Sequence, residues 1–82
     1  MAQVSSVAQT VRDLTGGLDQ FEVEAGTVRA LLAACEVRFP GLGQYVSEHM
    51  AIAIDGVLYQ EALGERLKPD SEVVLIPKIT GG

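Results

Sequence analysis

The most hydrophobic strand of the chain reads Glu72-Val73-Val74-Leu75-Ile76-Pro77 and is followed by Lys78-Ile79-Thr80-Gly81-Gly82. Its run of aliphatic residues gives both of its faces an apolar character. Such a strand lies in the centre of a sheet, or it buries one face and presents the other to a partner. We expect it in the middle of a mixed sheet, parallel to the first strand of the chain.

The residues before this strand supply its neighbours in the sheet. A first strand followed by a short helical turn fits residues 3–11. Residues 18–25 alternate apolar and polar side chains, which predicts a half-buried strand paired with the first one. Residues 50–54 and 57–59 are expected to form a second hairpin, because Asp55-Gly56 favours a tight turn.

One main helix is predicted between the two hairpins. Thr27 is a good N-cap for it, and Pro40-Gly41 ends it. Its apolar residues recur at helical spacing and form one stripe, made of Val28, Leu31, Leu32, Cys35 and Phe39. The residues from Gln44 to His49 are polar and are predicted to form a loop.

These elements predict an α+β fold of the β-grasp type, of which ubiquitin is the familiar example. We expect a mixed sheet of four to five strands curled over one main helix. A single domain is expected over residues 1–77, followed by a flexible Gly-Gly tail over residues 78–82. Because one helix covers only one face of a sheet, Leu58, Val74 and Ile76 are predicted to face solvent and to be available to a partner.

Composition and charge narrow the classes of partner. The 82 residues are 48% hydrophobic and 21% charged, as in an ordinary globular domain. The formal net charge of -5 disfavours nucleic acid and anionic membrane surfaces as partners. One cysteine and one histidine supply neither a disulfide nor a Cys/His metal site. With no signal peptide or membrane anchor in view, we expect a cytoplasmic protein that binds no metal and is a monomer when alone.

The α-carboxylate of Gly82 is the group on which chemistry is expected. At pH 7 it is an unreactive anion, so it must first be activated, for example as a mixed anhydride with AMP. A partner would have to supply the nucleotide site, because the chain lacks a phosphate-binding G-x-x-x-x-G-K-[ST] loop. Gly81, Thr80 and Ile79 are expected to insert with Gly82 into a narrow channel, since glycine has no Cβ to clash there. An ordinary terminus with two small residues is the alternative.

Three other features favour structural interpretations. Gly16-Gly17 predicts a turn, because no phosphate-binding fingerprint surrounds it. Cys35 lies on the apolar stripe of the predicted helix and is interpreted as a buried thiol. His49 follows Glu48 among polar residues and is interpreted as a solvated side chain. No catalytic set is apparent.

Taken together, several short motifs resemble those of the MoaD/ThiS sulfur carriers, in particular the small subunit of molybdopterin synthase. They occur in the family's order and spacing over almost the whole chain: Val11-Arg12-Asp13-Leu14-Thr15-Gly16-Gly17, Gly26-Thr27-Val28, Arg38-Phe39-Pro40-Gly41, Ala51-Ile52-Ala53-Ile54-Asp55-Gly56, Glu72-Val73-Val74-Leu75-Ile76-Pro77 and Thr80-Gly81-Gly82. Two features depart from the molybdopterin branch: Lys78 stands where that branch usually has a second proline, and the first strand is more polar.

The resemblance implies a carrier that is not an enzyme by itself. Its Gly82 carboxylate would be adenylated by an E1-like, ATP-using adenylyltransferase and converted to a thiocarboxylate, with no cofactor bound by this chain. In the molybdopterin branch, the tail inserts into the synthase large subunit and delivers sulfur to a pterin precursor. Leu58 and Ile76 match hydrophobic partner-binding positions of the family, and we expect Val74 and Lys78 to share that docking surface.

Other functions remain open at this point. The sulfur could serve cysteine or thiamine synthesis or tRNA thiolation. The chain could also be a ubiquitin-like modifier that forms an isopeptide bond through Gly82, or an interaction module whose tail carries no chemistry.

Overall fold

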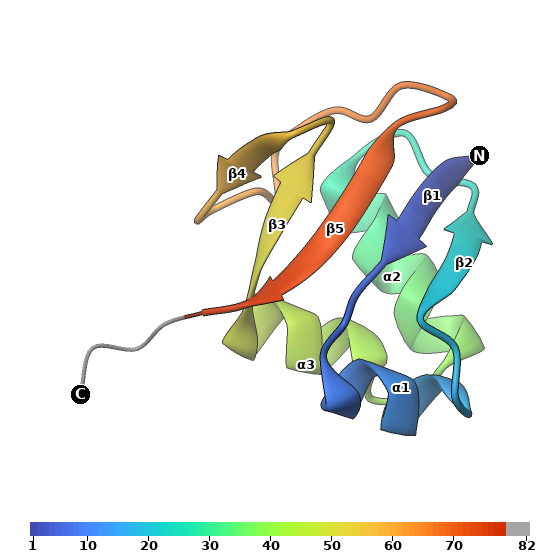
Figure 1. Ribbon diagram of the computed structural model, residues 1–82. Helices are drawn as coiled ribbons and strands as arrows, with labels where there is room; N and C mark the ends of the chain where they lie inside the picture. Colours follow the sequence, from blue (N-terminus) through green and yellow to red (C-terminus); the bar gives the residue numbers. More distant parts are fainter. Residues whose placement is uncertain (79–82) are drawn as a thin grey trace.

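The computed structural model describes residues 1–78, which form a mixed five-stranded sheet with three helices (Figure 1). The elements follow the order β1 (Ala2–Ser5), α1 (Gln9–Thr15), β2 (Gln20–Val23), α2 (Val28–Arg38), α3 (Leu42–His49), β3 (Met50–Ile54), β4 (Val57–Tyr59) and β5 (Glu72–Pro77). The strands are arranged in the order β2-β1-β5-β3-β4. The predicted α+β fold of β-grasp type is confirmed.

Strand β5 occupies the centre of the sheet. It runs parallel to β1, where Val4 lies opposite Val73, and antiparallel to β3, where Ile52 lies opposite Leu75. The inward side chains of Val73 and Leu75 are almost completely buried. The central position predicted from the hydrophobicity of this strand is therefore correct.

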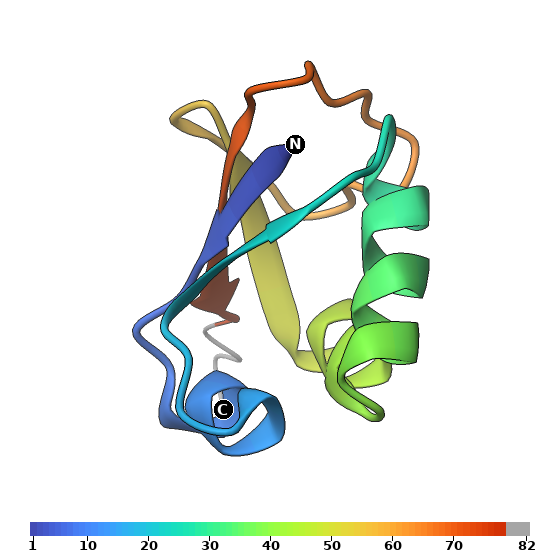
Figure 2. The same ribbon diagram turned by 90° about the vertical axis from the view of Figure 1, so that its right-hand side faces the viewer.

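Within residues 1–78, helices cover one face of the sheet and leave the other uncovered (Figure 2). Figure 2 shows α2 and α3 on the same side, α1 at one end of the sheet, and no helix over the opposite face. Helix α2 begins after Thr27, whose side-chain oxygen accepts the Ala30 N–H at 3.1 Å, as its N-cap role predicts. The core lies between α2 and the sheet, where Val28 and Leu31 meet the inward side chains of the strands.

The prediction of a loop at residues 44–49 was wrong, because these residues belong to helix α3. Its N-cap, Gly41, has no capping side chain. The cap comes instead from Glu36 on α2, whose carboxylate accepts the backbone N–H groups of Gly41 at 2.5 Å and of Gln44 at 3.0 Å. These hydrogen bonds lower the pKa of Glu36. A cap supplied by another helix leaves no mark in the local sequence.

The β3–β4 hairpin turns at Asp55-Gly56, as predicted, with φ angles of 49° and 86°. The Asp55 carboxylate also fastens this turn to the start of β5. One oxygen accepts the Glu72 N–H at 2.9 Å, and the other accepts the hydroxyl of buried Ser71 at 3.0 Å. Both hydrogen bonds favour the ionised form, so they lower the pKa of Asp55 below its ordinary value of 3.8.

Replacing Gly43 by alanine is expected to destabilise the fold. A Cβ at this position would collide with the Leu32 carbonyl oxygen and lie 2.9 Å from Glu36 Cβ, so α3 would have to move away from α2. Such overpacking costs about 1–3 kcal/mol, more than the roughly 1 kcal/mol that alanine gains in a helix. The midpoint of urea unfolding measures the loss of stability. Gly26→Ala is the control, because a Cβ there meets nothing within 4 Å. Equal midpoints for the two variants would contradict the close contact.

Replacing Asp55 by asparagine is expected to remove a pH-dependent part of the stability while keeping the turn, which asparagine also favours. Because the pKa of Asp55 is lower in the folded state, its contribution is fully present above 3.8 and is lost as the pH falls through the folded value. The wild type should therefore exceed Asp55→Asn in urea midpoint at pH 7, and the difference should shrink toward pH 3. A difference that stays constant with pH would contradict this role of the carboxylate.

Candidate functional site

The described chain ends at Lys78, directly after β5. The Lys78 N–H donates to the carbonyl of His49 at 3.0 Å, which ties the end of β5 to the last turn of α3. This bond fixes the point at which the C-terminal tail leaves the body (Figure 1). The predicted reactive group on Gly82, and the tail residues Ile79, Thr80 and Gly81, lie outside the described residues.

The sheet face opposite the helices carries an outer apolar patch made of Leu58, Val74 and Ile76. Their exposed fractions are 53%, 37% and 38%, which confirms the prediction that they face solvent. In the sheet, Ala53 lies between Leu58 and Val74, and Ala51 lies beside Ile76. Because alanine is small, the three larger side chains stand out on this face. Their part in partner binding stays a prediction.

The patch ends at β5, because β1 and β2 carry polar residues on the same face. The outward positions of these two strands hold Gln3, Ser5, Gln20 and Glu22. Between the patch and this polar half lies a shallow groove of about 280 Å³, lined by residues from the end of β1 and the second half of β5. The outer face therefore offers one apolar half and one polar half to a partner.

Ser6 holds the second half of β5 in place. Its buried hydroxyl donates to the Leu75 carbonyl at 2.8 Å and accepts the Ala8 N–H at 3.1 Å. The pairing of β1 with β5 ends at Ser5, and the Ser6 hydroxyl supplies the next hydrogen bond to β5. Sequence reasoning counted Ser6 only as part of a polar first strand. A single serine carries no pattern from which this contact, 69 residues along the chain, is predictable.

Lys78 lies apart from the three patch residues. It lines a pocket of about 430 Å³ between the inner face of the sheet and the helices, together with Leu32, Val46, Met50 and Ile52. The structure thus brings together Leu58, Val74 and Ile76 but places Lys78 at a different opening, next to the base of the tail. The four residues predicted to bind a partner are therefore divided between the outer apolar patch and the pocket at Lys78.

The remaining side chains of interest have structural roles. Cys35 is completely buried, as predicted, and burial raises the pKa of its thiol to about 11, so the thiol stays protonated at neutral pH. His49 is exposed, as predicted, but it belongs to the last turn of α3. Gly16 and Gly17 have φ angles of 74° and 105°, which confirms a turn. Within residues 1–78, no group of three or more His, Cys, Asp or Glu side chains is arranged to hold a metal ion.

None of the helices in the described part of the chain is long and apolar enough to span a membrane.

Solved structures of CysO proteins share this fold. A chain in the crystal structure of the Amycolatopsis orientalis BexX/CysO complex is 19% identical, with a TM-score of 0.83 and 100% of both chains covered. The crystal structure of Mycobacterium tuberculosis CysO, an antigen, is 16% identical, with a TM-score of 0.84 over 96% of this chain and 100% of that chain.

A solution structure of the small archaeal modifier protein 1 from Methanosarcina acetivorans also shares the fold. It is 22% identical, with a TM-score of 0.78 over 99% of this chain and 95% of that chain. At these identities the likeness concerns the fold. No protein of curated function matches the sequence significantly.

The sequence itself identifies the family. The model of the ThiS family matches residues 6–82, which is nearly the whole chain and includes the terminal Gly81-Gly82 pair. The resemblance to ThiS-type carriers drawn from the short motifs is therefore confirmed at the level of the family. The chain belongs to the ThiS family and has the β-grasp fold of ubiquitin-like sulfur carriers and modifiers.

Proposed function

We propose that this protein is a sulfur carrier whose C-terminal carboxylate receives, holds and donates sulfur. The observation that carries the proposal is the ThiS-family match, which extends through Gly82. A carboxylate oxygen of Gly82 attacks the α-phosphorus of ATP, and pyrophosphate leaves. Hydrosulfide supplied by a sulfur donor then attacks the carbonyl carbon of the acyl-adenylate. The new C–S bond replaces the bond to AMP, so AMP leaves, a proton is released and Gly82 ends as a thiocarboxylate.

The activating chemistry belongs to a partner. The described residues contain no phosphate-binding loop after a strand, and the one thiol, Cys35, is buried and protonated. We therefore propose that an E1-like adenylyltransferase binds the ATP and that this chain acts as a co-substrate without a cofactor of its own. The proposed setting is the cytoplasm, with the carrier monomeric when alone.

We further propose that the outer apolar patch of Leu58, Val74 and Ile76 docks on the partner enzymes. Exposed aliphatic side chains clustered on one sheet face are typical of a binding surface. Lys78 would contact the same enzyme from the base of the tail. The net charge of -5 favours a partner with a basic surface around the tail channel, because opposite charge accelerates association.

As the sulfur acceptor we propose the large subunit of molybdopterin synthase. This choice depends on the motifs that resemble that branch, Arg38-Phe39-Pro40-Gly41 among them. Carriers for cysteine synthesis, thiamine synthesis or tRNA thiolation are the alternatives, and the likeness of the fold to CysO structures is compatible with them.

A second candidate is a ubiquitin-like modifier that joins Gly82 to lysines of target proteins. The likeness to a small archaeal modifier protein favours it. Covalent adducts that resist reductant on denaturing gels of cell lysate would reveal this function, because sulfur transfer by itself leaves no isopeptide bond between Gly82 and another protein.

Deleting Gly82 is expected to abolish activation without affecting the fold. With the E1-like adenylyltransferase of the same organism and ATP, release of pyrophosphate should fall by at least about 100-fold, because the carboxylate no longer reaches the reacting phosphorus. The thermal midpoint should stay unchanged. Cys35→Ser serves as the control and should keep wild-type pyrophosphate release. Normal release from the shortened protein would contradict the proposal.

Replacing Ile76 by asparagine is expected to weaken docking on the same enzyme. Losing one apolar contact at the centre of an interface and placing an amide there costs about 1.4 kcal/mol or more, which is a tenfold rise in Kd. Val37→Asn is the matched control, since Val37 is an exposed aliphatic residue on α2, on the other side of the molecule. Isothermal titration gives both constants. Equal Kd values for the two variants would rule out the patch as the docking surface.

A further inference from the structure

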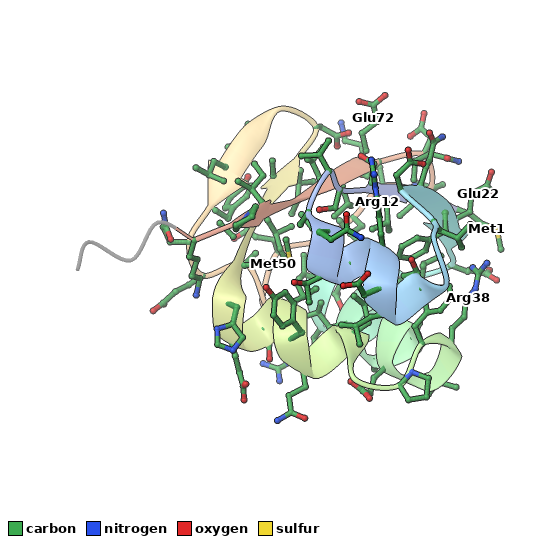
Figure 3. All side chains as sticks on the ribbon, turned by 60° about the horizontal axis from the view of Figure 1, so that its bottom comes forward. Met1, Arg12, Glu22, Arg38, Met50 and Glu72 are labelled. Carbon is green, nitrogen blue, oxygen red and sulfur yellow. The ribbon has the colours of Figure 1, made fainter. Side chains whose placement is uncertain are left out.

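The two edges of the sheet differ in whether their backbone groups are free. On the β2 edge, Glu22 directs its N–H and C=O outward, because its neighbour Gln3 turns its own N–H to Ser71 on the β5 side. Arg38 Nη1 donates to the Glu22 carbonyl at 2.8 Å, and the Arg38 guanidinium lies 5.0 Å from the centre of the Phe39 ring. Figure 3 shows Arg38 and Glu22 at this edge. The capped carbonyl and the charged side chain of Glu22 disfavour strand addition at this residue.

On the opposite edge, the corresponding residue is Leu58 of β4. The Asp55 N–H donates to the Glu72 carbonyl, so this rung of the β3–β5 ladder is hydrogen-bonded. Two residues along, Ala53 therefore directs its backbone groups to Val74 on β5. Leu58, which lies opposite Ala53 on the other side, must then point its N–H and C=O away from β3. Within residues 1–78, no hydrogen bond reaches these two groups.

Of the devices that normally protect an edge, β4 has its short length of three residues. It contains no proline, lysine or bulge, and Val57 and Leu58 are each 53% exposed. The β4 edge is therefore open, apolar and continuous with the outer apolar patch, which shares Leu58.

A pocket adjoins this open edge. Because β4 pairs only with residues 52–54 of β3, the beginning of β3 at Met50 pairs with β5 on one side and, within residues 1–78, has no strand on its β4 side. The pocket of about 430 Å³ opens there, with an apolar floor that includes Met50, Ile52 and Tyr59. Its rim carries Lys78 and Glu61. Within residues 1–78, the Glu61 carboxylate forms no ion pair. An extended segment that followed β4 would pass over this opening.

We propose that the β4 edge binds an extended segment of the enzyme that engages the C-terminal tail. The segment adds to the sheet through the N–H and C=O of Leu58 and places an apolar side chain in the pocket. A lysine or arginine next to that side chain matches the free carboxylate of Glu61 and the acidic charge of the chain. The position of Lys78 indicates which protein supplies the segment. Lys78 lines the pocket, and the C-terminal tail follows it in the sequence, so an enzyme that engages the tail lies next to the pocket. This inference rests on the proposed function, since the occupant is the enzyme proposed there.

The test uses the full chain and the E1-like adenylyltransferase of the same organism. Amide hydrogen exchange of Leu58, followed by NMR, should slow by at least about tenfold in the complex, because a solvated N–H becomes hydrogen-bonded. In parallel, Leu58→Pro should bind about tenfold more weakly than Leu58→Ala, since proline removes a donor that no strand of this chain uses. The control pair, Glu22→Pro and Glu22→Ala, makes the same change at the blocked edge and should bind equally.

The pocket is tested by filling it. Ser47→Phe places a ring at the pocket, whereas Gln44→Phe adds the same ring to α3 away from the pocket lining. Only Ser47→Phe should weaken binding. The inference is overturned, with the proposed function intact, when thiocarboxylate forms normally with the enzyme, ATP and a sulfur donor but Leu58 exchange is unchanged and Leu58→Pro equals Leu58→Ala. The absence of any complex with the enzyme overturns both. The exchange measurement needs no substitution, so a poorly folded variant cannot decide the result.

Discussion

The pairing of β5 with a strand on each side is the constraint on which the rest of the molecule depends. Parallel pairing with β1 and antiparallel pairing with β3 fix the last strand in the centre of the sheet. The Ser6 hydroxyl extends the hold on β5 after β1 has ended, and the bond from Lys78 to His49 fixes its last residue. The body therefore holds Lys78, the last described residue, at a defined place, which the proposed carrier function requires if a partner is to reach the terminal carboxylate.

The division of the sheet into covered and uncovered parts follows from the same arrangement. Since α2 and α3 pack on one face, the outer apolar patch is left to solvent on the other (Figure 2). The two edges are unequal as well, because Arg38 caps the carbonyl of Glu22 and nothing in residues 1–78 caps that of Leu58. The exposed patch, the open edge and the base of the tail all adjoin β3 and β5, so one partner surface can contact all three.

Features with a local cause could be predicted from the sequence. The aliphatic run of β5, the helical spacing of α2 and the turn at Asp55-Gly56 are set by neighbouring residues. Features that depend on a side chain of another element could not. Helix α3 begins where Glu36 on another helix supplies its cap, and the role of Ser6 depends on a carbonyl in the last strand. The pocket beside Lys78 could not be predicted either, since it forms from segments far apart in the chain.

The most direct test of the central claim is the intact mass of the protein after incubation with ATP, a sulfur donor and the E1-like adenylyltransferase, with fragmentation to locate any change. We expect a gain equal to the exchange of one oxygen for one sulfur, placed at Gly82. Cys35 should be unmodified, because it is buried and protonated. An unchanged mass in the presence of a competent enzyme, or sulfur found on Cys35, would contradict the account.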